Sequence, residues 1–402
     1  MAPKKTVLIG AYGTTNFGDD ILMVSVLGVL RDFVEDECIY VRTVRTEFDY
    51  LRRWYPQVNF FPAGHDVFED NFELALYGGG TQFYSFAPES PVKSCFFARK
   101  LNSLKFYAKK PELLLSKFFP KNRVNYAQQI HSEKTYGVSL GAGPFRNDSA
   151  EQQAKSKLAG CDWISVRDSL SKDFCEKAGL QKVSLFADMC YARGLWDSTK
   201  SEYSQKIHLK KIGVIIRDWP FMAENPFMAP LHSAVKELES RGLEAEYISL
   251  APRCDMGALA ELRRRKIPCF CWDPDEMVIS ELVEKLGEFD LFISSRAHGI
   301  VVGACLGIPS IGVLIEPKLR LIAEGLRDSV SFWDAPFNPK ALLDKVTLIS
   351  EVYEEVVAQT RRYAEICARS AMSGADELRK RLYDVYQVPN SNSDSNCSEK
   401  IR

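Results

Sequence analysis

The 402-residue chain lacks three features that would place it in a familiar class of protein. It has no basic excess, because its formal net charge is −1, whereas nucleic-acid-binding proteins normally carry a positive surface. It has no long hydrophobic run either. The longest uncharged stretch, residues 299–315, is interrupted by Gly307 and Pro309 and is too short to span a bilayer. We therefore expect no nucleic-acid partner and no integral membrane segment, and any anion site must be built from a few placed cations.

The third missing feature is a set of cysteines with metal-ligand spacing. Of the eleven cysteines, only Cys269 and Cys271 lie close together, in an apolar run typical of a strand and with no further ligand nearby. The N-terminal apolar run that starts at Val7 is too short for a signal peptide. We expect a cytoplasmic protein with reduced thiols, no metal site and no tightly bound cofactor.

What the sequence does contain is a regular alternation of short apolar runs and helical stretches, which is typical of α/β domains with parallel sheets. In the first half we expect strands at Thr6–Tyr12, Cys38–Thr43, Leu74–Tyr77, Thr135–Leu140, Trp163–Val166 and Val183–Ala187, and helices at Ile21–Phe33, Val92–Leu115, Ala150–Leu158 and Leu170–Ala178. In the second half we expect strands at Ile212–Arg217, Glu246–Leu250, Cys269–Trp272, Asp290–Ser294 and Ser310–Ile315, and helices at Phe227–Arg241, Ala258–Arg265, Glu276–Leu286, Gly299–Leu306 and Leu319–Leu326.

The length of the chain exceeds what one hydrophobic core usually organises, so we expect two Rossmann-like domains. A polar stretch without periodicity follows Gly194 and is the expected linker. We predict an N-terminal domain at 1–195, a C-terminal domain at 196–345, helices at 346–387 and a disordered Ser/Asn-rich tail at 388–402.

Ligands of open parallel sheets bind at the carboxyl ends of the strands, and unusual residues collect there. After the first strand come Asn16 and Asp19, which either cap the following helix or bind a substrate. After the strand that ends at Tyr77 come three glycines, among them Gly79 and Gly80. They predict that another backbone or a ligand approaches closely, with an ordinary turn as the alternative. Asp188 ends another expected strand in the same half.

The second half places cations at the equivalent positions. Arg217 closes one strand, Arg296 and His298 open an apolar helix, and Lys318 follows the last expected strand. A lone arginine at a strand end commonly makes a surface salt bridge, and a lone histidine is commonly structural. Three neighbouring strand ends that all present cations instead favour an anion pocket, because helix N-termini also attract anions.

These residues resemble the motifs of the polysaccharide pyruvyl transferase family. The similar segments are Gly13–Asp20, Gly78–Gly80, Ser165–Asp168 and Ser295–His298, and their order and spacing extend the resemblance from about Val7 to Lys318. One departure is Asp20, where many members carry glutamate. The resemblance implies a glycosyltransferase-B-like fold and transfer of pyruvate from phosphoenolpyruvate to a sugar as a cyclic ketal, in exopolysaccharide or cell-wall polysaccharide synthesis.

The resemblance also implies roles. Arg217, Arg296 and Lys318 would hold phosphoenolpyruvate, and His298 would protonate its methylene carbon. Asp19 or Asp188 would orient the acceptor or take its proton, and the sequence leaves that choice open. Asn16, Gly79 and Gly80 would lie on the acceptor side.

The expected partners are phosphoenolpyruvate as co-substrate and a sugar or lipid-linked oligosaccharide acceptor, which would bring the protein to the membrane periphery. Two alternatives remain: a nucleotide-sugar glycosyltransferase of the same fold, and a non-catalytic carbohydrate- or anion-binding protein. Oligomeric state stays open.

Overall fold

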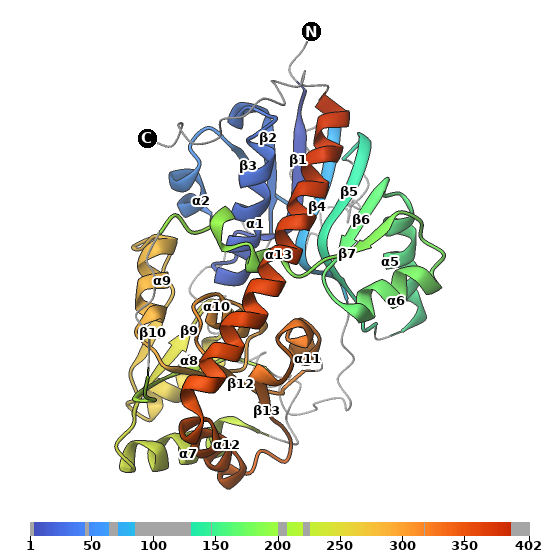
Figure 1. The fold of residues 1–402 in the computed structure, drawn as a ribbon. Helices are drawn as coiled ribbons and strands as arrows, with labels where there is room; N and C mark the ends of the chain where they lie inside the picture. Colours follow the sequence, from blue (N-terminus) through green and yellow to red (C-terminus); the bar gives the residue numbers. More distant parts are fainter. Residues whose placement is uncertain are drawn as a thin grey trace, which may run out of the picture.

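The computed structural model describes residues 4–44, 48–63, 71–84, 130–145, 147–199, 207–219, 226–316 and 318–386, and it contains two parallel sheets with interleaved helices (Figure 1). The first sheet has the strand order β3-β2-β1-β4-β5-β6-β7. Its strands are β1 (Thr6–Tyr12), β2 (Ile39–Thr43), β3 (Asn59–Pro62), β4 (Phe72–Phe83), β5 (Ser132–Ala142), β6 (Trp163–Val166) and β7 (Val183–Leu185). Its described helices are α1 (Phe17–Leu30), α2 (Asp49–Trp54), α5 (Asp148–Ala159) and α6 (Ser169–Lys177).

The second sheet has the order β10-β9-β8-β11-β12-β13. Its strands are β8 (Lys211–Ile215), β9 (Glu244–Ser249), β10 (Cys269–Cys271), β11 (Leu291–Ser294), β12 (Ser310–Val313) and β13 (Val330–Trp333). The accompanying helices are α7 (Met228–Ser240), α8 (Met256–Arg264), α9 (Ile279–Gly287), α10 (Ala297–Cys305), α11 (Lys318–Ile322) and α12 (Pro339–Glu351). The two sheets lie on either side of the expected boundary near residue 195, and the domain limits themselves stay a prediction.

The α/β architecture with two parallel sheets is confirmed, and among the strands and α-helices that the structure describes, three were missed. Two of them, β3 and β13, are four-residue edge strands, and the third, α2, is a six-residue helix. Such short segments contain too few residues to show the hydrophobic periodicity from which a strand or helix is predicted. The expected helix Val92–Leu115 and the tail at 388–402 lie outside the described residues.

The expected end of the strand at Tyr77 and the alternative of a turn there are wrong, because β4 continues through the three glycines to Phe83. Gly79 and Gly80 have φ of 61° and 78°, and the register with β5 shifts beyond Gly80. The close approach expected at these glycines is present. A Cβ added to Gly79 would lie 3.1 Å from the side chain of Leu22, so helix α1 packs directly on this part of the strand.

Each sheet reverses its strand order beside its central strand, between β1 and β4 in the first and between β8 and β11 in the second. At such a switch point the segments that follow the two strands diverge and leave a crevice at their carboxyl ends. The segment after β1 carries Asn16 and Asp19, and the segments after β8 and β11 carry Arg217 and Arg296. The fold therefore puts the predicted site residues at both switch points.

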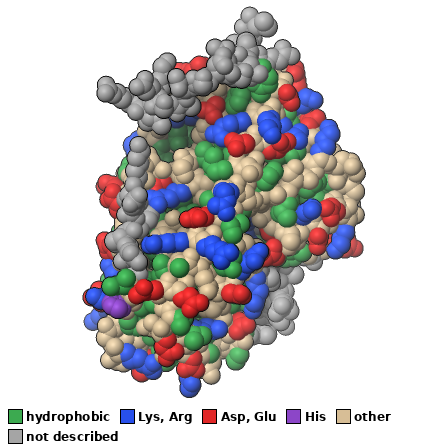
Figure 2. Space-filling model, in the orientation of Figure 1, with side chains coloured by type: hydrophobic (Ala, Val, Ile, Leu, Met, Phe, Trp, Pro, Cys, Tyr) green, Lys and Arg blue, Asp and Glu red, His purple; other side chains and the backbone are tan. Residues whose placement is uncertain are grey.

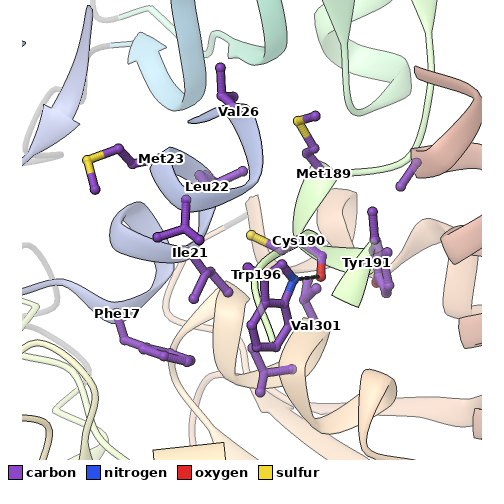
Figure 3. Packing of buried hydrophobic residues seen from close by; sticks show 14 of the residues in the cluster. Phe17, Ile21, Leu22, Met23, Val26, Met189, Cys190, Tyr191, Trp196 and Val301 are labelled. Carbon is purple, nitrogen blue, oxygen red and sulfur yellow. Dashed lines mark hydrogen bonds between the residues drawn. The ribbon is translucent and has the colours of Figure 1, made fainter. Parts of the chain in front are cut away.

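Helices α1 and α10 are apolar around nearly their whole circumference, and most of their residues are buried, as is typical of helices inside a core. Figure 3 shows Phe17 and Ile21 of α1 near Trp196, at the end of the first half, and near Val301, which lies in α10. The two halves are also joined by the backbone, since the N–H of Phe17 donates to the carbonyl of Leu250 at 2.9 Å. The beginnings of α1 and α10 therefore face each other between the halves.

The 34-residue helix α13 (Tyr353–Tyr386) begins in the second half and runs across the first (Figure 1). At its start, the hydroxyl of Tyr353 donates to the carbonyl of Asp290 at 2.8 Å. Further along, Ser370 Oγ accepts from the N–H of Ala187 at 3.0 Å, and near its end Tyr386 bonds the hydroxyl of Thr6. Helix α13 thus ties the end of the described chain to its first strand.

The face seen in Figure 2 mixes Lys and Arg side chains with Asp and Glu side chains, in agreement with a net charge of −1. Within the part of the chain that the structure describes, no helix is both long and apolar enough to cross a membrane.

Candidate active site

The first-half side of the site is the start of α1. Asn16 is the N-cap residue but makes no capping bond through its side chain. Its Nδ2 instead donates to Asp19 Oδ2 at 2.6 Å. The other oxygen, Oδ1, lies next to Gly80, where an added Cβ would approach it to 3.4 Å. Burial raises the pKa of Asp19, while Lys318 and the bond from Asn16 oppose the rise.

Asp188 lies between β7 and the short helix η3 (Met189–Tyr191), and both of its carboxylate oxygens accept hydrogen bonds. Arg167 Nη1 donates to Asp188 Oδ2 at 2.6 Å, and both side chains are 1% exposed. The N–H of Cys190 donates to Asp188 Oδ1 at 2.9 Å. Burial alone would raise the pKa of Asp188, but Arg167 and His298 hold it below its ordinary value.

Arg167 follows β6 and carries donors that the ion pair with Asp188 does not use. Its Nε and Nη2 are buried and have no hydrogen-bond partner, although Asp168 Oδ2 lies 3.8 Å from Nε. Asp168 itself caps α6 by accepting from the N–H of Ser171 at 2.8 Å. Buried arginine donors without partners are rare, so they mark a place where an acceptor group fits.

In the second half, both predicted arginines are paired with carboxylates of the same half. Arg296, the N-cap residue of α10, forms a buried ion pair with Asp255, yet its Nε has no partner. Arg217 pairs with Glu316, and its guanidinium carbon lies 4.2 Å from the ring centre of Trp219. These pairs fix the orientation of the two guanidinium groups, and the carboxylates reduce the net positive charge of this part of the site.

His298 occupies the second position of α10 and packs against the start of α1. A Cβ added to Gly18 would lie 1.9 Å from His298 Nδ1, so glycine is required for this approach. His298 Nε2 is buried without a hydrogen-bond partner. Burial, together with Arg167, Lys318 and Arg296, lowers the pKa of His298 to about 3, although Asp188 acts in the opposite direction.

Lys318 opens α11 and completes the cluster. Burial and the charge of Arg167 lower its pKa to about 8, while Glu316 and Asp19 oppose this. The structure therefore brings Asp19, Asp188, Arg296, His298 and Lys318 together, with Arg217 joined to them through Glu316. Asn16 and Gly80 reach the cluster through Asp19, and Gly79 contacts Leu22.

Close packing of α10 on the sheet also follows the sequence. A Cβ at Gly299 would lie 2.3 Å from Ser294 Oγ, and one at Gly303 would lie 2.7 Å from the ring of Phe292. These glycines let the beginning of α10, with Arg296 and His298, sit directly above the ends of β8 and β11.

One group of side chains among the described residues could offer ligand atoms to a metal ion. Atoms of Asp188, Cys190 and His298 lie within 4.8 Å of one another. The pairing of Asp188 with Arg167 and the cations around His298 oppose a divalent ion at this place. Since the three residues come from both halves, no sequence spacing could have indicated this group.

Three residues of the site were missed as site residues: Arg167, Asp255 and Glu316. Arg167 lies in the Ser165–Asp168 motif, so the motif was the available signal for it. Asp255 is separated from Arg296 by 41 positions, and nothing in its own neighbourhood distinguishes it from an ordinary surface aspartate.

The sequence profile of the polysaccharide pyruvyl transferases matches residues 16–317 and therefore spans both switch points. The chain belongs to the polysaccharide pyruvyl transferase family. The matched range begins at Asn16 and ends immediately before Lys318. No curated protein matches the chain in a sequence comparison.

Solved structures similar to this polysaccharide pyruvyl transferase family member confirm the glycosyltransferase-B-like fold. Anabaena HepE in complex with UDP has a TM-score of 0.54 at 10% identity, over 94% of this chain and 100% of that chain. The Staphylococcus aureus MnaA–UDP structure has a TM-score of 0.57 at 12% identity, over 98% and 100%. The Neisseria meningitidis UDP-GlcNAc 2-epimerase bound to UDP-GlcNAc has a TM-score of 0.54 at 12% identity, over 94% and 100%.

Proposed function

We propose that this protein transfers pyruvate from phosphoenolpyruvate to two hydroxyls of a sugar and forms a cyclic ketal. The observation that carries the proposal is the partnerless Nε2 of His298, buried between the halves and surrounded by Arg167, Arg296 and Lys318. A histidine set among cations serves a reaction whose substrate is a small polyanion that needs a proton.

The donors left over in the cluster suit phosphoenolpyruvate, which carries a carboxylate and a phosphate. Nε of Arg296 and Nε and Nη2 of Arg167 have no hydrogen-bond partner among the residues that the structure describes. Guanidinium groups bind carboxylate and phosphate through paired hydrogen bonds, and Lys318 adds a point charge. Arg217, which is 21% exposed, would meet the substrate at the mouth of the site.

The pKa of His298, about 3, leaves its imidazole neutral before the substrate binds. A bound polyanion neutralises the cations that lower this pKa, so binding favours the imidazolium. The proton then passes to the methylene carbon, and a sugar hydroxyl attacks the neighbouring carbon. The second hydroxyl displaces phosphate, which leaves with the proton of that hydroxyl.

The first attacking hydroxyl needs a base, and the two carboxylates differ in their fitness for this role. Both oxygens of Asp188 accept hydrogen bonds, and its pKa is lowered, so it is a weak base that orients Arg167. Asp19 accepts from Asn16 through Oδ2, and its pKa is raised by burial. We therefore assign the base role to Asp19.

The test is phosphate release from phosphoenolpyruvate across a panel of galactosides and N-acetylmannosaminides. Release that depends on both phosphoenolpyruvate and one acceptor class, with a pyruvylated sugar detected by mass spectrometry, supports the proposal. Binding of phosphoenolpyruvate without turnover on any acceptor would favour a binding protein instead.

The alternative function is a nucleotide-sugar glycosyltransferase. HepE and MnaA were both solved with UDP, and these likenesses are to the fold at low sequence identity. A direct binding assay with UDP-sugars beside phosphoenolpyruvate separates the two hypotheses. Preference for a UDP-sugar would overturn the pyruvyl-transfer proposal.

A further inference from the structure

A cavity with a volume of about 550 Å³ lies beside the candidate active site. Its walls come from α8, from the segments that follow β9 and β10, and from Thr15 after β1. It therefore opens at the carboxyl ends of two strands of the second sheet, where ligands of this fold class bind. Its volume is in the range of small-molecule sites.

Thr15 shows two features that a filled, purely structural position would not need. Its φ is 56°, a left-handed conformation that is unfavourable for a β-branched residue. The residue is 3% exposed, and Oγ1 has no hydrogen-bond partner within the described part of the chain. Strained residues with unsatisfied polar atoms collect where a ligand supplies the missing partner.

The charges around the cavity balance. Arg253 and Arg263 line it together with Asp273 and Asp275, and Arg253 lies 3.9 Å from Asp275. The remaining wall includes Trp272 and several apolar side chains. Two cations and two anions suit an uncharged ligand with many hydroxyls better than a phosphate, because hydroxyls both donate and accept.

The cavity is connected to the active site through two backbone segments. In the loop after β9, Asp255 forms the ion pair with Arg296, and Arg253 lines the cavity. On the other side, Thr15 directly precedes Asn16, whose side chain binds Asp19. A ligand in the cavity therefore lies next to the residues assigned to the acceptor.

We propose that this cavity is an acceptor subsite, which binds uncharged sugar units adjoining the sugar that receives pyruvate. The inference rests on the proposed function, and it adds that the preferred acceptor is an oligosaccharide rather than a single sugar. Arg263 and the hydroxyl of Thr15 contribute hydrogen bonds to the adjoining units.

The test compares mono-, di- and trisaccharide glycosides from the same panel. Arg263→Ala should lower kcat/KM for the longer acceptors about 10-fold, the loss expected for one hydrogen bond to a charged group. It should leave kcat/KM for the monosaccharide and KM for phosphoenolpyruvate unchanged. Thr15→Val should act in the same direction, and melting curves check that it folds.

Arg264→Ala is the matched control, because Arg264 is the next residue on α8, is 74% exposed and does not line the cavity. It should behave as wild type. Equal effects of Arg263→Ala on short and long acceptors, or none on either, would overturn the subsite.

Binding of the trisaccharides is also measured without phosphoenolpyruvate, by saturation-transfer NMR. If the protein releases no phosphate, the proposed function fails, whereas loss of trisaccharide binding in Arg263→Ala but not Arg264→Ala still supports the cavity as a glycan site. Absence of any trisaccharide binding to the wild type, together with no preference for longer acceptors, would sink the inference.

Discussion

The two halves of the molecule share a strand order around their central strands but place different chemistry at the carboxyl ends. The first half presents Asn16 and Asp19, and the second presents Arg296, His298 and Lys318. Each half also contains the opposite charge, since Asp188 neutralises Arg167 in the first, and Asp255 neutralises Arg296 in the second. The two halves therefore differ in the type of side chain that they present at the site, and within the described residues the Nε2 of His298 has no hydrogen-bond partner.

The largest effect that we expect from this difference between the halves is at His298. His298→Asn should lower kcat by a factor of about 100 to 10,000, the usual contribution of a positioned acid. Affinity for phosphoenolpyruvate should change little, because the arginines remain. Steady-state kinetics and a direct binding assay measure the two effects.

His232→Asn is the matched control for that variant. His232 is also a buried histidine of the second half, but its Nδ1 bonds Tyr247 at 2.7 Å, far from the cluster in the packing of α7 on β9. The control should lose stability and keep its turnover. Normal turnover in folded His298→Asn would remove the histidine from the mechanism.

The first half separates into a base and a positioning residue. Asp19→Asn should lower kcat about 100-fold with little change in the melting temperature, as expected for loss of a general base. Asp188→Asn should mainly destabilise the fold, by about 3 kcal/mol or more, because it leaves the buried Arg167 without its carboxylate. Kinetics and denaturant unfolding of both variants test this, and the reverse pattern would exchange the two roles.

The second half should lose substrate affinity when its arginines are shortened. Arg217→Ala and Arg296→Ala should each weaken phosphoenolpyruvate binding by about 2 kcal/mol, roughly 30-fold. Arg296→Ala also leaves the buried Asp255 without its ion-pair partner. The double variant with Asp255→Asn therefore separates an effect on binding from an effect on folding. Arg320→Ala, whose side chain is 54% exposed, is the control. Unchanged affinity in both arginine variants would contradict the anion pocket.

A smaller effect concerns the contact between the halves at Asp20. This carboxylate accepts from Tyr50 at 2.8 Å and from Trp272 Nε1 at 3.4 Å, and burial raises its pKa to about 7. A raised pKa means that the folded state holds the proton more tightly than the unfolded state. The contribution to stability is full below about pH 4 and is lost as the pH rises through about 7.

Asp20→Asn imitates the protonated side chain at every pH. Its advantage over the wild type in unfolding free energy should therefore grow by about 2 to 3 kcal/mol between pH 5 and pH 8. Urea unfolding at the two pH values measures the difference. A gain that is the same at both would show that Asp20 does not titrate between them.

The smallest expected effect is that of metal removal. Arginines and a lysine supply the positive charge that magnesium often provides to phosphoryl groups, so activity should be unchanged by a chelator. Loss of activity on chelation, restored by a divalent ion, would direct attention to Asp188, Cys190 and His298.

The strands with clear apolar runs and the positions of the charged residues at their ends could be predicted from the sequence, because both are local properties. The partners of those charges could not. Arg296 meets Asp255 and Arg217 meets Glu316 only after the sheet has formed, at separations of 41 and 99 residues. The close approach at the glycines after Tyr77 was predicted, but the continuation of β4 through them was not, since it depends on pairing with β5 and on α1 packing against them.

Helix α13 is about 50 Å long if it keeps ideal geometry, and it is fastened at both ends. Tyr353 holds its start to the second half, while Arg379 bonds Asp32 at 3.0 Å and Lys4 bonds the carbonyl of Val385 at 2.8 Å in the first half. A rod fixed in this way resists a hinge motion that would swing the halves apart. We therefore expect a crevice of nearly constant width, which substrates would enter and leave without a large opening of the molecule.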